Sequence, residues 1–146
     1  MIRNVILIAV ALSAAGCGRS KPEKPKAADP VAFTLACTGT LVNEEDVALG
    51  SLNFSVTIDL ANTETLLSNI ATDREAYLPA ALQSRNGDIA KVSANDQAIT
   101  IDLNTGTRRD SENRLVLDRR TGKFTGPSSI GSCAKAALIP LPAQKF

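Results

Sequence analysis

The chain contains no histidine and no tryptophan, and aromatic residues make up only 3% of its 146 residues. Without histidine, neither Ser-His-Asp nor Cys-His catalysis is available, and no imidazole can hold a metal ion. The scarcity of aromatic rings also argues against a carbohydrate-stacking groove, since such sites rely on aromatic faces. The residue inventory therefore favours a non-catalytic protein, and we expect neither a cofactor nor a metal.

An excess of charge of one sign is also lacking. Sixteen lysine and arginine residues stand against 15 aspartate and glutamate residues, which gives a formal net charge of +1. A domain this close to neutral has no electrostatic footprint for nucleic acid, whose recognition depends on clustered positive charge. We therefore expect no nucleic-acid partner.

The chain begins with a short apolar run instead of a membrane-spanning one. Arg3 precedes the uninterrupted apolar stretch Val5–Leu12, and the small residues Ser13–Gly16 lead directly to Cys17. A positive start, an apolar middle and small residues before a cleavage point are typical of a secretory signal peptide. A transmembrane helix would need about 20 apolar residues, so the run predicts export and not a membrane span.

The residues Ala14, Ala15, Gly16 and Cys17 resemble the lipobox of bacterial lipoproteins. The resemblance implies that residues 1–16 are removed as a signal peptide and that the sulfur of Cys17 receives a diacylglyceryl group. More than one acyl chain would anchor the protein stably to a membrane. By the sorting rule of enteric bacteria, the following Gly18, which is not Asp, implies the outer membrane, facing the periplasm. We therefore expect a lipid-anchored protein of the cell envelope.

Residues 17–30 form a second region of different composition. Their sequence after Cys17, GRSKPEKPKAADP, is rich in proline and lysine and has no apolar periodicity. Such a stretch buries too little apolar surface to offset its ordering entropy, and its prolines favour extended conformations. We expect a flexible tether that separates a folded domain, residues 31–146, from the membrane.

Two cysteines remain if Cys17 is lipidated. Cys37 and Cys133 lie near the two ends of the domain, and an even number in an exported protein favours a disulfide. Cys37 is in phase with Phe33 and Leu35, so it should point inward. A redox pair or a metal site would be the alternatives, but the chain has neither a C-x-x-C motif nor a histidine.

The hydrophobic pattern of residues 31–146 predicts an all-β domain. Apolar residues alternate with polar ones throughout Leu52–Leu60 and again in Ile99–Leu103. Turn signals such as Asn86-Gly87 and Thr121-Gly122 separate such segments. Further strands are expected at Val31–Cys37, Ile89–Val92, Arg114–Asp118 and Ser128–Ala136. We predict a small antiparallel sandwich or barrel with one short helix or irregular insertion, closed by one disulfide.

Two segments depart from this pattern. We expect Ala61–Ser84 to form an irregular connection, in which Thr72–Glu75 resembles a helix capping box and Pro79 limits any helix to a short turn. The final segment, Leu138–Phe146, contains two prolines and cannot form a central strand. We expect its apolar residues to cover a sheet edge.

A basic cluster is the main candidate binding feature of the domain. It comprises Arg108, Arg109, Arg114, Arg119, Arg120 and Lys123. One interpretation is a patch for an acidic polymer or for the acidic face of an envelope protein. The favoured alternative is a solvated β-hairpin edge protected by charge.

The layout is similar to that of uncharacterised exported proteins of alphaproteobacteria. The similarity rests on Cys37, on Gly131-Ser132-Cys133 and on the turn Asp118–Gly122, and it implies no activity. We expect an envelope lipoprotein whose domain binds or assembles with a partner. The alternatives are a protective lysozyme inhibitor, a class that includes disulfide-bonded β-barrel lipoproteins, and a hydrolase built on carboxylates or on the S-x-x-K spacing of Ser132 and Lys135.

Overall fold

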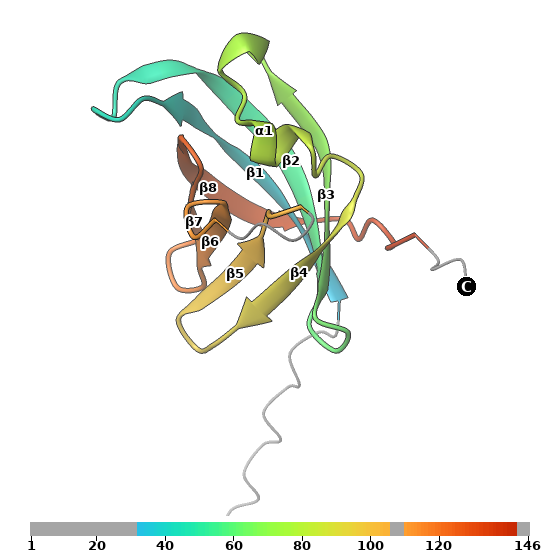
Figure 1. The fold of residues 1–146 in the computed structure, drawn as a ribbon. Helices are drawn as coiled ribbons and strands as arrows, with labels where there is room; N and C mark the ends of the chain where they lie inside the picture. The colour runs from blue at the N-terminus through green and yellow to red at the C-terminus, as the bar shows by residue number, and fades with distance from the viewer. Residues whose placement is uncertain (1–31, 106–109, 143–146) are drawn as a thin grey trace, which may run out of the picture.

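The computed structural model describes residues 32–105 and 110–142 (Figure 1). The predicted signal peptide, Cys17 and the predicted tether lie outside the described residues. Eight antiparallel strands form a closed barrel, in which each strand pairs with the next and β8 pairs with β1. The strands are β1 (Ala32–Val42), β2 (Ala48–Asp59), β3 (Glu64–Thr72), β4 (Ile89–Ala94), β5 (Ala98–Asp102), β6 (Arg114–Asp118), β7 (Lys123–Gly126) and β8 (Ser129–Ala136).

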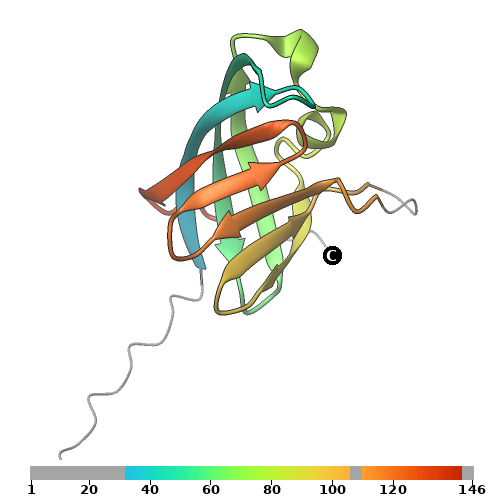
Figure 2. The same ribbon diagram turned by 90° about the vertical axis from the view of Figure 1, so that its left-hand side faces the viewer.

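The predicted fold class is confirmed, and the barrel is the correct one of the two predicted architectures. Short connections join most consecutive strands, so each strand lies beside its neighbour in sequence. Figure 2 shows β1, β8, β7, β6 and β5 side by side across one wall. Pairing of the first strand with the last closes the sheet and removes the two edge strands that an open sheet would have.

Alternation along the strands builds the interior. On β2, Leu52, Phe54, Val56 and Ile58 are at most 3% exposed and point inward. The ring of Phe54 packs edge-to-face against that of Phe124 on β7, with the ring centroids 5.1 Å apart. Aromatic pairs favour this arrangement because the positive edge of one ring meets the negative face of the other. One continuous core therefore lies inside the barrel.

The expectation of an irregular connection throughout Ala61–Ser84 is wrong for its first part, which forms β3. The sequence did not indicate this strand because residues on both of its faces are buried, so apolar and polar residues do not alternate along it. Leu67 points inward and is 0% exposed, whereas Leu66 points outward and is still only 7% exposed. Asn69, with a φ of 55°, lies within the irregularity of the β2–β3 pairing and interrupts the alternation.

The predicted short helix is present, but the predicted capping box is not. A 3₁₀ turn, η1 (Glu75–Tyr77), begins after Arg74 and has no side-chain cap. The nearby Asp73 carboxylate instead accepts a hydrogen bond from the backbone N–H of Ser51. Helix α1 (Ala80–Gln83) follows Pro79, and its Leu82 is fully buried in the core. This insertion lies at the end of the barrel where β3 ends and β4 begins (Figure 1).

The segment after β8 lies on an outer face of the sheet instead of covering an edge strand, because β1 and β8 pair with each other and close the barrel. It forms no strand over residues 137–142, as its prolines predicted. The backbone N–H of Ile139 instead donates a hydrogen bond of 2.9 Å to the hydroxyl of Thr34. Thr34 points outward from β1, so this contact places the segment on the outer wall of the barrel.

Candidate functional site: the open end of the barrel

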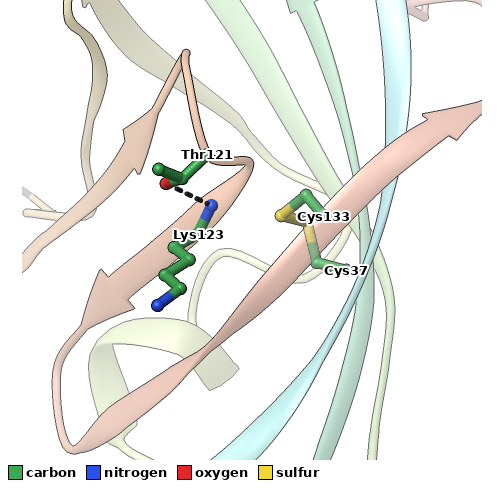
Figure 3. The surroundings of a disulfide bond; sticks show 4 residues. All are labelled: Cys37, Thr121, Lys123 and Cys133. Atoms are coloured by element: carbon green, nitrogen blue, oxygen red, sulfur yellow. Dashed lines mark hydrogen bonds between the residues drawn. A yellow bond between two sulfur atoms is a disulfide. The ribbon is translucent and has the colours of Figure 1, made fainter.

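A disulfide joins the first and last strands of the barrel (Figure 3). Cys37 on β1 lies directly opposite Cys133 on β8, with Cα atoms 4.0 Å apart, and the predicted bond is confirmed. Both residues occupy inward-facing positions. The bond therefore fixes the closure of the barrel from inside, across 96 residues of sequence.

A cavity of about 310 Å³ opens beside this disulfide, and we call it the mouth cavity. Its apolar wall consists of Phe33, Leu35, Leu60, Ile99 and Leu117, and Cys133 completes it. Phe33 and Leu35 lie at the start of β1, Leu60 directly follows β2, and the remaining wall residues belong to the start of β5, the end of β6 and β8. All of these positions lie at the end of the barrel opposite α1, where β1 begins and β8 ends.

The two ends of the barrel differ in how they are filled. At the α1 end, Leu41, Leu82 and Leu103 are at most 1% exposed and occupy the interior. At the mouth, Phe33 and Leu35 are only partly buried, although they also face inward. An eight-stranded barrel is just wide enough to be filled by side chains or to hold one small ligand. Two further hollows, of about 480 Å³ and 390 Å³, lie beside the α1 insertion and are lined by more polar side chains. The mouth cavity is distinguished from them by its mostly apolar wall.

Charged residues lie at the rim of the mouth cavity. Lys135 is paired with Leu35 and therefore occupies an inward-facing register position, yet it is exposed. Arg119 also lines the rim, and its Nη1 donates a hydrogen bond of 2.9 Å to the backbone carbonyl of Asn95. Lys135 therefore lines the mouth cavity from an inward-facing register position and brings a positive charge to its rim.

Asp118 contributes the negative charge of the rim. Its carboxylate accepts hydrogen bonds of 2.8 Å from the backbone N–H groups of Thr121 and Arg120. These bonds, that of Thr121 first, hold the pKa of the Asp118 carboxyl below its usual value of 3.8. The carboxylate thus has a structural role in the β6–β7 turn.

The structure brings only part of the predicted basic cluster together. Arg119, Arg120 and Lys123 lie in or beside the β6–β7 turn at the mouth end. Arg114 begins β6 at the other end, and five residues of extended chain separate it from Arg119 by roughly 16 Å. Arg108 and Arg109 lie outside the described residues. Lys123 follows the register of outward-facing Ser132, and its side chain extends away from the disulfide (Figure 3).

The S-x-x-K spacing of Ser132 and Lys135 does not form a catalytic pair. Residues three apart on a strand point to opposite faces. Ser132 faces outward, next to Cys133, which faces the interior with Lys135. A nucleophile and its base must lie within hydrogen-bonding reach of each other, and the wall of the barrel separates these two side chains.

Sequence reasoning missed Lys135 as a residue of the mouth. A signal was present, because counting the alternation from the inward-facing Cys133 places Lys135 inward as well. Leu60 and Leu117 were recognised only as strand residues. Their convergence depends on the closure of the barrel, which joins β1 to β8.

Among residues 32–105 and 110–142, no helix is long and apolar enough to cross a membrane. In the same part of the chain, no group of three or more His, Cys, Asp or Glu side chains is arranged to hold a metal ion. Comparison with protein-family models, curated proteins and solved structures finds no match for this chain.

Proposed function

We propose that this protein is a non-catalytic binding protein of the bacterial cell envelope, anchored by lipid at Cys17 and binding its ligand at the mouth of the barrel. The observation that carries the proposal is the apolar lining of the mouth cavity. Leucine side chains fill the interior at the α1 end, and the hollows beside α1 have more polar linings, whereas the mouth opens into a largely apolar cavity of about 310 Å³. Small-molecule sites have volumes of about 300–1,000 Å³ and occur at barrel mouths.

The position of the chain start supports a role at a membrane. β1 begins at Ala32, and this is the end of the barrel that holds the mouth cavity. A tether attached there would turn the mouth toward the anchored side. The 14 residues between Cys17 and Ala32 span at most roughly 50 Å when fully extended. A ligand leaving the membrane would therefore be within reach of the mouth.

The anchoring half of the proposal is tested with the full chain in a bacterial host. Cells supplied with an alkyne-tagged palmitate should label the wild-type protein and carry it in the membrane fraction. The Cys17→Ala variant should lose both the label and the membrane association. Equal labelling of the two proteins, or equal membrane association without label, would show that Cys17 is not the anchor.

The binding half is tested with an envelope lipid extract. A ligand that binds the folded protein raises its unfolding midpoint by mass action. We expect the extract to raise the midpoint of the wild-type protein in a concentration-dependent way. A Leu60→Asp variant, which places a carboxylate in the apolar wall, should show a much smaller shift relative to its own ligand-free midpoint. No shift for the wild-type protein would contradict binding at the mouth.

Assembly into an envelope complex is the other form of a binding role. Pull-down of the lipidated protein from cross-linked envelopes, compared with the Cys17→Ala variant, tests it. One defined complex that is lost with the anchor would indicate an assembly role at the membrane. Recovery of no partner would leave the mouth cavity as the carrier of function.

Protection against lysozyme is a second candidate, and the disulfide-bonded barrel favours it because inhibitors with this architecture are known. The single tyrosine of the chain, Tyr77, is 50% exposed in η1, at the end opposite the mouth, so a contact with lysozyme through this side chain would not involve the mouth cavity. An inhibitor should slow the lysis of peptidoglycan by lysozyme at a stoichiometric concentration. Unchanged lysis at a large molar excess would exclude this function.

A further inference from the structure

We propose that the ligand of the mouth cavity is a single-chain alkyl carboxylate, whose chain occupies the apolar interior and whose carboxylate meets Lys135. This inference rests on the proposed binding function and specifies its ligand class. It uses the apolar wall, the size of the cavity and the charge of its rim.

The apolar wall of the mouth cavity favours a ligand with a hydrocarbon chain. Phe33, Leu35 and Leu60 carry no polar side-chain atoms, and Ile99 and Leu117 continue the same surface toward the core. The disulfide adds a further wall without a charge. A ligand group with hydrogen-bonding atoms would lose its water there without gaining partners, whereas methylene groups gain from leaving water. The interior therefore favours an unbranched or weakly branched hydrocarbon.

The size of the cavity limits the ligand to one chain. At about 310 Å³, the cavity is at the lower end of the range for small-molecule sites. A lipid with two acyl chains would exceed it. A single chain of medium length can instead lie along the barrel axis with its polar end at the rim.

The positive charge at the rim of the mouth cavity favours a ligand whose polar end is negatively charged. Lys135 is the charged residue that strand alternation directs inward, and Cys133 and Leu35 lie beside it below the rim. Among the residues that line the cavity, Arg119 and Lys135 are positive and Asp118 is negative, so two positive charges against one negative charge leave the lining with a net charge of +1. A monoanionic head balances this charge, and a carboxylate accepts charge-assisted hydrogen bonds from an ammonium group.

The test compares three probes with equal chain length and different heads: dodecanoate, 1-dodecanol and dodecyltrimethylammonium. The two ionic probes are used below their critical micelle concentrations and the alcohol below its solubility limit. Binding to the folded wild-type protein is measured by calorimetry and by the shift of the unfolding midpoint. We expect one dodecanoate per protein, with an affinity about tenfold above that of dodecanol, and the weakest binding for the cation. Charge-assisted hydrogen bonds support a factor of this size.

Variants separate the head contact from the chain contact. Lys135→Glu should lower the affinity for dodecanoate at least tenfold and reverse the preference between the anionic and cationic probes. Leu60→Asp should weaken all three probes. Two matched controls should bind as the wild type does: Lys123→Met, with an outward-facing lysine at the same end, and Ile130→Ser, with an exposed apolar residue on the outer wall.

The outcomes distinguish the ligand class from the binding function. Equal affinity for the three heads, or an unchanged dodecanoate affinity in Lys135→Glu, would overturn the assignment of a carboxylate. Binding of several probe molecules that Ile130→Ser weakens and Leu60→Asp does not would place the probes on the outer wall and overturn the site. If the envelope extract stabilises the protein but dodecanoate does not, the ligand class is wrong and the binding function stands. If neither does, both fail.

Discussion

The hydroxyl oxygens of Thr34 and Thr57 lie 2.7 Å apart, share a hydrogen bond, and are buried on the outer wall of the barrel. Thr34 is 2% exposed and Thr57 is 0% exposed, although both point away from the interior. Thr34 also accepts the hydrogen bond from the backbone N–H of Ile139. One hydroxyl therefore connects β1, β2 and the segment after β8.

Replacing Thr34 by valine should destabilise the protein by about 1–3 kcal/mol, because the substitution keeps the shape and removes the hydroxyl. The part-buried Ile139 N–H and the buried Thr57 hydroxyl would each lose a hydrogen-bond partner. Urea unfolding followed by circular dichroism measures the change as a lower midpoint with an unchanged slope.

The control for this substitution is Thr125→Val, because Thr125 is an exposed threonine on β7. It should change stability by no more than about 0.5 kcal/mol. The double variant Thr34→Val/Thr57→Val should cost less than the sum of the two single variants, since both remove the same bond. Strict additivity would show that the two hydroxyls contribute independently.

The Cys37–Cys133 bond should contribute strongly to stability. It closes a loop across 96 residues, for which the chain-entropy account gives about 4–5 kcal/mol. The double variant Cys37→Ala/Cys133→Ala should therefore unfold at a much lower urea concentration than the oxidised wild-type protein. Wild-type protein treated with a reductant should approach the same midpoint. Identical midpoints for the oxidised protein and the variant would contradict a stabilising role.

Strands whose outward positions are polar could be predicted from the sequence, and a strand with apolar residues on both faces could not. β2 and β5 alternate because apolar residues face the core and mostly polar residues face outward, including the buried Thr57 of β2. In β3, Leu66 is buried on the outer face, where it lies beside Thr57. Burial on this outer wall involves Ile139, which follows Thr34 by 105 residues. No local pattern contains that contact.

The residues of the candidate site also divide into those that the sequence could predict and those that it could not. Cys37 and Cys133 were predictable because composition and export context favour pairing, and strand phase places Cys37 inward. The basic cluster relied instead on closeness in sequence, and β6 carries Arg114 and Arg119 to opposite ends of the barrel. The mouth cavity depends on which strand ends meet when the sheet closes. That is a property of the whole fold and not of any segment.

Gly39 and Gly131 lie opposite each other on β1 and β8, beneath the ring of Phe124. A Cβ atom at Gly39 would lie 2.7 Å from Cζ of Phe124 and would also meet the backbone carbonyl of Ile130. Gly39→Ala should therefore cost about 1–3 kcal/mol through overpacking, with a comparable loss for Gly131→Ala. Urea unfolding measures both.

The matched control for the glycine variants is Ser132→Ala, one residue along β8 on the outer face. It should leave stability nearly unchanged, because it adds nothing to the interior. An equal loss in Ser132→Ala and Gly131→Ala would indicate a general sensitivity of β8 and not a steric limit beneath Phe124.

Acid should weaken the β6–β7 turn through Asp118. Hydrogen bonds from the Thr121 and Arg120 N–H groups lower the pKa of this carboxyl in the folded protein below its usual 3.8. The unfolded chain therefore binds the proton more readily. The resulting stabilisation is fully present above pH 3.8 and is lost as the pH falls through the folded-state pKa.

Asp118→Asn keeps an oxygen that can accept the turn hydrogen bonds and removes the titration. Urea midpoints measured from neutral to acid pH should therefore fall less steeply for Asp118→Asn than for the wild type. Acid sensitivity should remain in the variant, because hydrogen bonds from Asn62 and Ser51 also lower the pKa values of Asp59 and Asp73. Superimposable pH profiles for the two proteins would show that the Asp118 carboxylate adds nothing that the neutral amide does not.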